Sequence, residues 1–404
     1  MKKLLIISLL IGFILSILAL KYDEPITFTL IAIVWFFIFI RLMLTTQKSI
    51  IKNIYYNLAF TILLLGILEM YSLYHLKYAK SQYRSETTVK DDNSSKYIIE
   101  NKYFGYGPTK DIKINKKRFY NETMLYSADY TIENGLRITP SSNSNLNDEC
   151  IIFFGGSFTF GEGVNDQESM PYIVGSLQNK KVYNWGFGGY GPHQMLATID
   201  NEMINCEPNV IIYQAIEGHI VRSAGKASWD KVGPKYILDN GILYFSGFFD
   251  DTDSSNINQS SLIKKINNQL EKSYLYKKYI LKEGTYFISD YDVQLYNEII
   301  ATTQKKILAQ FSESEFHIIL WDKPPGTDED FFKNETNDNN IEKMINEFKR
   351  LNIKFHLISN ILPNYFNKME KYEISQYDKH PNALAHQLIA DYVVKNIINK
   401  QGVK

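Results

Sequence analysis

The sequence has few cysteines, no excess of charge and no pattern of metal ligands. Lysine plus arginine equal aspartate plus glutamate, at 44 each in 404 residues. No net charge therefore favours a polyanionic partner, and nucleic-acid binding is not expected. The seven histidines form no cluster with metal-ligand spacing, and no glycine-rich segment has the spacing of a dinucleotide loop. The sequence predicts neither a metal nor a cofactor.

Hydrophobic residues are concentrated near the N-terminus, in three long runs. The runs are Leu4–Leu20, Ile26–Leu44 and Ile54–Leu76. Each reaches or nearly reaches the ~20 residues with which a helix crosses the hydrocarbon core of a bilayer. The first run is also compatible with a cleaved signal peptide. Two further runs and the lack of a clear small-residue cleavage site favour three retained transmembrane helices within residues 1–84.

The charges of the loops predict how these helices are oriented. Basic residues occur before the first run and between the second and third, whereas the first loop carries Asp23 and Glu24 beside a single lysine. Because positively charged loops stay in the cytoplasm, the N-terminus is expected inside. Three crossings then place everything after Leu76 on the outer side of the membrane. Glu69 lies within the third run, and the sequence gives it no role.

The outer part of the chain divides into two segments. Residues 85–147 are polar, with β-like pieces at Asp111–Ile114 and Ala128–Ile132 and a Ser/Asn-rich end, which is typical of an appendage or linker. From residue 148, short and wholly apolar runs alternate with helix-like stretches. Such runs are typical of strands buried on both faces of a parallel sheet. The alternation predicts an α/β sandwich over residues 148–404, with an insertion at about 225–310.

Five strands and five helices are expected in this sandwich. The strands are Ile151–Phe154, Lys181–Tyr183, Val210–Tyr213, His317–Trp321 and Ile353–Ile358. The helices lie near Pro171–Gln178, Gln194–Ile204, Tyr296–Phe311, Ile341–Leu351 and Ala383–Asn399. In such a sheet, a functional site lies beyond the carboxyl ends of the strands.

The two cysteines, Cys150 and Cys206, precede the first and third of these strands. In an oxidising compartment an isolated pair can form a disulfide, and neighbouring strands would bring the two residues close together. The sequence leaves a disulfide and two free thiols equally open.

Two short segments carry side chains suited to nucleophilic catalysis. Ser157 directly follows Gly155 and Gly156 where the first strand ends, which is the position of a nucleophile. A simple glycine-rich turn with Ser157 as helix N-cap would give the same pattern. Asp378 and His380 stand two residues apart before the last helix. The acid can fix the imidazole tautomer, and the imidazole can accept a proton from a serine. A solvated loop in which Asp378 or Asn382 caps the helix is the alternative.

Three segments, taken in order, resemble the SGNH, or GDSL-like, hydrolase family. Gly155-Gly156-Ser157 is similar to its first block, in which an aspartate that is not the catalytic acid usually stands at the position of Gly156. Asn184–Gly189 is similar to the second block, and Asp378–Asn382 to the fifth. Two further stretches, Asn134–Arg137 and Ser157–Val164, resemble a membrane-tethered branch of the family found in bacterial envelopes.

The resemblance covers roughly residues 128–400 and implies a three-layer, flavodoxin-like sandwich around a parallel sheet, the SGNH hydrolase fold. It implies Ser157 as nucleophile, His380 as general base and Asp378 as the acid that orients the imidazole. The oxyanion hole would use the backbone N–H groups of Ser157 and Gly189. With the predicted helices, it also implies a protein of the bacterial inner membrane that crosses it three times, with a cytoplasmic N-terminus and a periplasmic or extracellular catalytic domain.

The third block is where this sequence departs from the family pattern. The family usually has Gly-x-Asn-Asp after the strand Val210–Tyr213, and its asparagine completes the oxyanion hole. Here no asparagine is present, and His219, which follows Gly218, is the best substitute because an imidazole N–H can donate to an oxyanion. The alternative is that His219 pairs with Glu217 or packs under Arg222.

These observations predict a serine esterase that removes O-acyl groups, acetyl in the first instance, from an envelope glycan or lipid-linked saccharide. An O-acyltransferase would use the same residues, exclude water and admit a second sugar. A glycan-binding or assembly protein that kept the fold without catalysis is the third possibility. The expected partners are the lipid bilayer and an O-acylated glycan or glycolipid, with no nucleic acid.

Overall fold

The computed structural model describes residues 27–74, 97–140 except 121, 149–249 except 228 and 231, Ser273, 286–323, 332–334 and 339–399. The chain divides into two compact units. Unit 1 comprises Met1–Glu86 with Ser255–Thr285, and unit 2 comprises Thr87–Ser254 with Tyr286–Lys404.

Unit 1 contains two long apolar helices among its described residues, α2 (Thr27–Thr45) and α3 (Ser49–Leu73). Both are long and apolar enough to cross a membrane, and they correspond to the second and third predicted runs. The first run, Leu4–Leu20, lies outside the described residues, so two apolar helices are shown and not the predicted three. The helices approach closely at Gly66, where a Cβ atom would lie 2.9 Å from that of Ala32. Small residues permit such close contact between membrane helices.

Unit 2 is built around an eight-stranded sheet with the order β14-β12-β8-β6-β7-β5-β4-β3. Its parallel part consists of β6 (Glu149–Gly155), β7 (Lys181–Asn184), β8 (Glu207–Ile216), β12 (Glu315–Trp321) and β14 (Lys354–Leu357). Counted along the chain, these strands lie in the order 2-1-3-4-5, which is that of a flavodoxin-like, doubly wound sheet. The predicted α/β fold with a mostly parallel sheet is confirmed.

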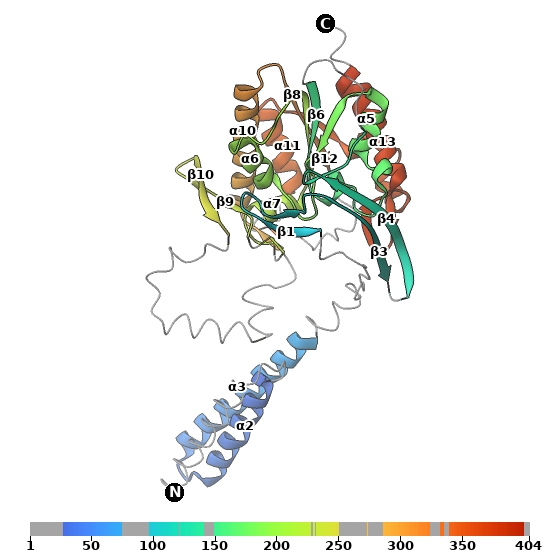
Figure 1. The fold of residues 1–404 in the computed structure, drawn as a ribbon. Coiled ribbons are helices and arrows are strands. Elements are labelled where there is room, and N and C mark those ends of the chain that lie inside the picture. Colours follow the sequence, from blue (N-terminus) through green and yellow to red (C-terminus); the bar gives the residue numbers. More distant parts are fainter. Residues whose placement is uncertain are drawn as a thin grey trace. The chain divides into compact units, whose positions relative to one another are not determined.

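Helices cover both faces of the parallel part (Figure 1). One layer contains α5 (Met170–Gln178) and α13 (Ala383–Val393), which a π-helical turn extends to Ile398. The other contains α6 (Pro192–Asp200), α10 (Asp290–Gln310) and α11 (Asn340–Arg350). Successive residues of β6 point to opposite layers: Ile151 packs against the first, and Ile152 against the second. Because both faces are covered, the strand is apolar and buried from Cys150 to Phe154.

An antiparallel ribbon extends the sheet beyond β7. It consists of β3 (Ile112–Tyr120), β4 (Thr123–Glu133) and β5 (Leu136–Arg137). Along β4, buried residues alternate with more exposed ones from Tyr126 to Ile132, as expected for a strand with one solvated face. The sequence assigned these residues to an appendage within 85–147. Instead, they continue the main sheet.

The remaining elements of unit 2 are short. They are β1 (Ile98–Asn101), β2 (Gly105–Pro108), α4 (Ser157–Phe160), η3 (Asp166–Glu168), α7 (Gly218–Ser223), β9 (Pro234–Asp239), β10 (Ile242–Phe248), β11 (Tyr286–Ile288), β13 (Phe332–Asn334), α12 (Ile358–Ile361), η4 (Tyr365–Asn367), η5 (Met369–Tyr372), β15 (Glu373–Ser375) and β16 (Asp378–Pro381). Within the predicted insertion, β9 and β10 form a hairpin whose turn residues, Asn240 and Gly241, both have positive φ. Such a pair of residues is typical of a two-residue hairpin turn.

Cys150 at the start of β6 is joined by a disulfide to Cys206, which lies just before β8. The bond thus joins the starts of two neighbouring parallel strands. Of the two possibilities that the sequence left open, a disulfide or two free thiols, this structure has the disulfide.

Candidate active site

The strand order reverses at β6, because the chain runs from β6 to β7 on one side and then crosses to β8 on the other. In doubly wound sheets the crevice at this switch point, beyond the carboxyl ends of the strands, is where ligands bind. Ser157 lies there, at the first position of α4 directly after β6. Gly155 has a φ of 151°, and a Cβ atom at this position would lie 2.2 Å from Oγ1 of Thr159. Only glycine allows the sharp turn that exposes Ser157.

The three predicted catalytic side chains meet at this point. Nε2 of His380 lies 2.9 Å from Oγ of Ser157, 223 residues away in sequence. Nδ1 of His380 lies 2.6 Å from Oδ1 of Asp378, which also accepts a hydrogen bond from the backbone N–H of His380 at 3.1 Å. Asn382 caps α13, because its side chain accepts from the N–H of Ala385. Of the two residues suggested as a helix cap, Asn382 therefore fills this role, and Asp378 faces the imidazole.

Asp378 also forms an ion pair with Arg118, a residue that the sequence analysis did not single out. Nη1 of Arg118, on β3 of the ribbon, donates to Oδ2 of Asp378 at 2.7 Å, and the side chain of Asp378 is 1% exposed. Burial raises the pKa of this carboxyl, but His380 and Arg118 together hold the pKa well below its ordinary value. Asp378 is therefore ionised at neutral pH. A carboxyl group must be ionised to stabilise an imidazolium.

A second buried carboxylate lies near the imidazole. Glu162 accepts hydrogen bonds from Nζ of Lys116 at 2.5 Å and from the hydroxyl of Tyr126 at 2.7 Å. Burial raises the pKa of Glu162, whereas the charges of Lys116 and His380 and these hydrogen bonds bring the pKa below its ordinary value. Both donors come from the ribbon, so β3 and β4 supply much of the polar surroundings of His380.

Arg137 holds the loop that follows the nucleophile. Its side chain is fully buried, and it donates to Oδ1 of Asp166 at 2.9 Å and to the carbonyls of Phe160, Gly161 and Val164 at 2.6–2.7 Å. A buried guanidinium is tolerated only when its donors are satisfied in this way. The residue lies in the stretch Asn134–Arg137 that the sequence singled out, and its contacts give that stretch a physical role.

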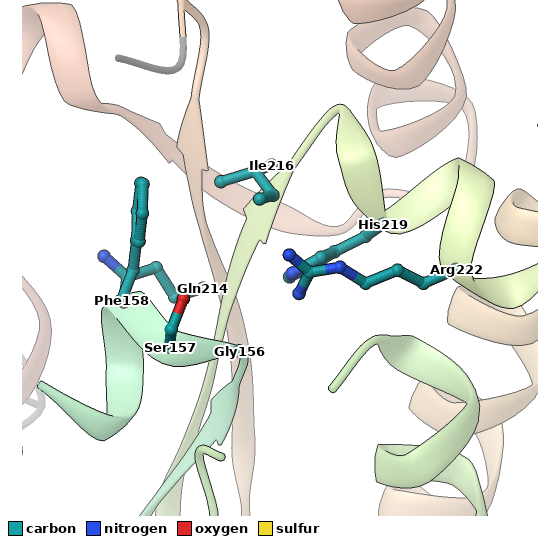
Figure 2. Close-up of a pocket in the computed structure, with 7 residues that line it drawn as sticks. All are labelled: Gly156, Ser157, Phe158, Gln214, Ile216, His219 and Arg222. Carbon is teal, nitrogen blue, oxygen red and sulfur yellow. The ribbon is translucent and has the colours of Figure 1, made fainter. Parts of the chain in front are cut away.

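A small pocket adjoins Ser157. It is lined by seven residues, namely Gly156, Ser157, Phe158, Gln214, Ile216, His219 and Arg222. Figure 2 shows His219 and Arg222 projecting from α7 toward Ser157, across the pocket from Phe158. The predicted substitute for the missing asparagine is thus placed beside the nucleophile. The alternative pairing of His219 with Glu217 is not observed, because Glu217 accepts from Asn340 at 2.8 Å.

His219 is buried and neutral. Its Nδ1 lies 2.5 Å from the hydroxyl of Tyr213 on β8. Burial, followed by the charges of Arg222 and His193, lowers the pKa of His219 well below its ordinary value. A neutral imidazole keeps one N–H group and can donate one hydrogen bond.

Gly156, His219 and Arg222 form one packed arrangement. A Cβ atom at Gly156 would lie 2.6 Å from Nη1 of Arg222 and 3.3 Å from Nε2 of His219. Any side chain at position 156 would therefore collide with the residues that follow β8. Glycine at position 156 thus leaves room for His219 and Arg222 beside Ser157.

Gly189 is not among the residues that line the pocket. It has a φ of 82°, and a Cβ atom there would lie 2.4 Å from the hydroxyl of Tyr106 and 2.8 Å from the ring of Trp229. The hydroxyl of Tyr106 donates to the carbonyl of Gly188 at 3.1 Å. The glycine-rich loop is thus packed between two aromatic side chains, and the predicted oxyanion role of Gly189 stays a prediction.

No protein-family model matches this chain, and no curated protein sequence matches it. Several solved structures are similar. A member of the lipolytic protein G-D-S-L family from Veillonella parvula is 14% identical over 62% of this chain and 98% of its own, with a TM-score of 0.34. A GDSL-like lipase from Bacteroides thetaiotaomicron is 12% identical over 63% of this chain and 89% of its own, with a TM-score of 0.33. An acetyl xylan esterase from the rumen bacterium Butyrivibrio proteoclasticus is 13% identical over 70% of this chain and 74% of its own, with a TM-score of 0.34. The chain thus shows distant structural similarity to GDSL-like hydrolases.

Proposed function

We propose that this protein is a membrane-anchored serine esterase of the SGNH type, which removes small O-acyl groups from an envelope glycan or lipid-linked saccharide. The observation that carries the proposal is the contact of Ser157, His380 and Asp378 at the carboxyl edge of the sheet, with 2.9 and 2.6 Å between the partners. This arrangement supports an enzyme over a binding protein that kept only the fold.

The reaction proceeds by acyl transfer through the serine. Nε2 of His380 takes the proton of Ser157, and Oγ attacks the ester carbonyl carbon. The resulting oxyanion accepts hydrogen bonds from the backbone N–H of Ser157 and from the side chain of His219. His380 then gives its proton to the sugar oxygen, which leaves, and the acyl group stays on Oγ. Water attacks the acyl carbon after losing a proton to His380, and that proton returns to Oγ as the carboxylic acid departs.

The anchor and the location belong to the same proposal. Three helices, formed from the runs that begin at Leu4, Ile26 and Ile54, would cross the inner membrane and leave the catalytic unit on its outer side. Two apolar helices among the described residues support this arrangement. The disulfide between Cys150 and Cys206 also supports it, because structural disulfides persist in oxidising compartments outside the cytoplasm.

Covalent trapping of Ser157 tests the proposed function. The full chain in detergent is treated with a fluorescent serine-reactive phosphonate, and hydrolysis of p-nitrophenyl acetate is followed in parallel. Labelling and hydrolysis are expected in the wild type and in Ser127→Ala, which removes a hydroxyl on β4 outside the site, and neither is expected in Ser157→Ala. Labelling that persists in Ser157→Ala, or a wild type that is never labelled, would refute the proposal.

A further inference from the structure

The imidazole of His219 is useful to an oxyanion only if one particular nitrogen carries the proton. Nε2 is the nitrogen that faces the site, since it would lie 3.3 Å from a Cβ atom at Gly156, beside Ser157. Nδ1 faces away from the pocket toward Tyr213. A neutral imidazole has one N–H donor and one acceptor nitrogen, so the wrong tautomer would present a lone pair to a developing negative charge.

We infer that Tyr213 is a positioning residue that holds His219 as the Nε2–H tautomer, so that a neutral imidazole replaces the missing asparagine as a fixed hydrogen-bond donor to the oxyanion. This inference rests on the proposed function, because it assigns a task to His219 during acyl transfer at Ser157. Tyr213 does not touch the substrate and acts only through the imidazole.

The donor and acceptor strengths of the two groups select the direction of the hydrogen bond between the Tyr213 hydroxyl and the His219 imidazole. The hydroxyl of Tyr213 and Nδ1 of His219 are 2.5 Å apart, and both side chains are almost completely buried. A phenol O–H is a better donor than an imidazole N–H, and an imidazole nitrogen is a better acceptor than a phenol oxygen. The hydroxyl of Tyr296 on α10 also interacts with the hydroxyl of Tyr213. Tyr296 has a proton of its own to donate to the oxygen of Tyr213, which leaves the proton of Tyr213 for Nδ1 and gives all three groups a partner. The hydroxyl of Tyr213 therefore donates to Nδ1. Since the partner of one ring nitrogen decides where the single proton resides, the proton lies on Nε2.

The surroundings keep both groups in the required protonation states. Burial raises the pKa of Tyr213 well above its ordinary value, so the hydroxyl keeps its proton. Burial and the nearby positive charge of Arg222 lower the pKa of His219, so the ring does not become an imidazolium. The guanidinium thus excludes a second cation from the pocket, and the donor does not titrate in the range where His380 must act as a base.

The position of Tyr213 in the fold makes it suited to this task. It lies within β8, and His219 lies six residues later on α7, after the strand has ended. The tyrosine side chain is fixed by the core between the sheet and the layer of α6, α10 and α11. A rigid strand therefore orients a ring that stands at the edge of the pocket. An asparagine side chain needs no such partner, because its amide nitrogen always carries donors.

The first test reads the tautomer directly. The full chain, labelled with ¹³C,¹⁵N-histidine and placed in lipid bilayers, is studied by magic-angle-spinning NMR, which distinguishes protonated from unprotonated ring nitrogens. The signals of His219 are assigned from their loss in His219→Gln, among the seven histidines of the sequence. A protonated Nε2 and an unprotonated Nδ1 are expected in the wild type, and a mixture of tautomers in Tyr213→Phe. A wild-type Nδ1 that carries the proton would overturn the inference.

The second test is a double-mutant cycle on ester hydrolysis. Glutamine at position 219 offers an amide N–H near the place of Nε2 and has no tautomers. With His219 present, Tyr213→Phe is expected to lower kcat by at least about tenfold with little change in KM, up to the ~10²–10³-fold cost of losing an oxyanion donor outright. In the His219→Gln background, the same substitution is expected to change kcat by less than about twofold, because the coupling between the two residues has been removed.

The two readouts separate this inference from the proposed function. An equal loss of kcat from Tyr213→Phe in both backgrounds would show a merely structural role for Tyr213 and overturn the inference. A wild type without phosphonate labelling would count against the esterase, whereas the tautomer of His219 is read in the resting protein and needs no turnover.

Discussion

Placing a methyl group on Gly156 should disturb the oxyanion side of the pocket. The φ of Gly156 is −89°, outside the left-handed region, and the effect of Gly156→Ala is expected from the contacts of the new Cβ. The new Cβ would lie 2.6 Å from Nη1 of Arg222 and 3.1 Å from the carbonyl oxygen of Tyr190. That same carbonyl accepts from Nη1 of Arg222 at 2.6 Å. The guanidinium must therefore move away from a hydrogen bond that now fixes it.

The size of the effect follows from how far Arg222 must move. Ordinary contact begins at 3.4 Å, which is 0.8 Å beyond the 2.6 Å at which the Cβ would lie. Overpacking a well-fitted site typically costs ~1–3 kcal/mol. If this cost falls on the transition state, kcat/KM for p-nitrophenyl acetate drops by about 5- to 150-fold. Gly188→Ala is the matched control, because a Cβ at Gly188 would meet nothing within 4 Å. Its rate is expected to match the wild type.

Removing the guanidinium tests whether the contact with Arg222 causes the loss of rate in Gly156→Ala. In an Arg222→Ala background, Gly156→Ala is expected to lower kcat/KM by less than about threefold, since the closest contact is gone. Full activity of Gly156→Ala alone would refute the packing argument. So would an equal loss in both backgrounds, which would assign the effect to the backbone of Tyr190. Thermal unfolding of each variant separates a loss of rate from a loss of folded protein.

Three further predictions concern charge, cross-linking and protonation. Arg118→Ala should lower kcat/KM for p-nitrophenyl acetate by about tenfold, because Oδ2 of Asp378 loses its charged donor and a hydrogen bond to a charged group contributes about 1.5 kcal/mol or more; Lys113→Ala on the same strand should leave kcat/KM unchanged, and full activity of Arg118→Ala would contradict the assignment. Replacing both Cys150 and Cys206 by alanine opens a loop that spans 56 residues and should lower the free energy of unfolding in urea by up to about 4 kcal/mol, whereas a loss below about 1 kcal/mol would show that the cross-link contributes little. Burial lowers the pKa of His386 to about 3, so between this value and the ordinary ~6.5 the unfolded chain binds a proton that the folded protein excludes; stability should fall by up to about 2 kcal/mol from pH 7 to pH 5, and identical pH slopes for the wild type and His386→Gln would refute this.

The parallel part of the fold was predictable because burial on both faces leaves a plain signal. The run Ile151–Phe154 has no polar residue, and all four side chains are buried in the structure. A strand of this kind must lie inside a layered sheet, and the helices between the runs then fix a doubly wound arrangement. The meeting of Ser157 with the pair Asp378 and His380 was expected from the resemblance of their segments and not from the strand pattern, because Asp378 and His380 lie on β16, which pairs with β15 and not with the parallel sheet.

The ribbon was not predictable in the same way. Residues along β4 alternate between buried and exposed from Tyr126 to Ile132, which marks a strand but does not say which partner it pairs with. Only one residue pair, Arg137 opposite Asn184, joins β5 to β7. No local pattern in the sequence specifies so small a contact. Arg118 was missed for the same reason, because its partner Asp378 lies 260 residues further along the chain.

The ribbon of β3, β4 and β5 also contributes residues to the candidate active site. Arg118 from β3 holds the acid that orients the imidazole, and Arg137 from β5 holds the loop that follows the nucleophile. Both contacts are buried or partly buried, so their energies are only weakly screened by salt. The parallel sheet presents Ser157 at its carboxyl edge, and β16 brings His380 and Asp378 to it. Arg118 adds to His380 in holding the pKa of Asp378 below its ordinary value, and Arg137 binds three carbonyls of the loop after Ser157. Both arginines come from strands at the far end of that sheet, so the ribbon is part of the setting of the site.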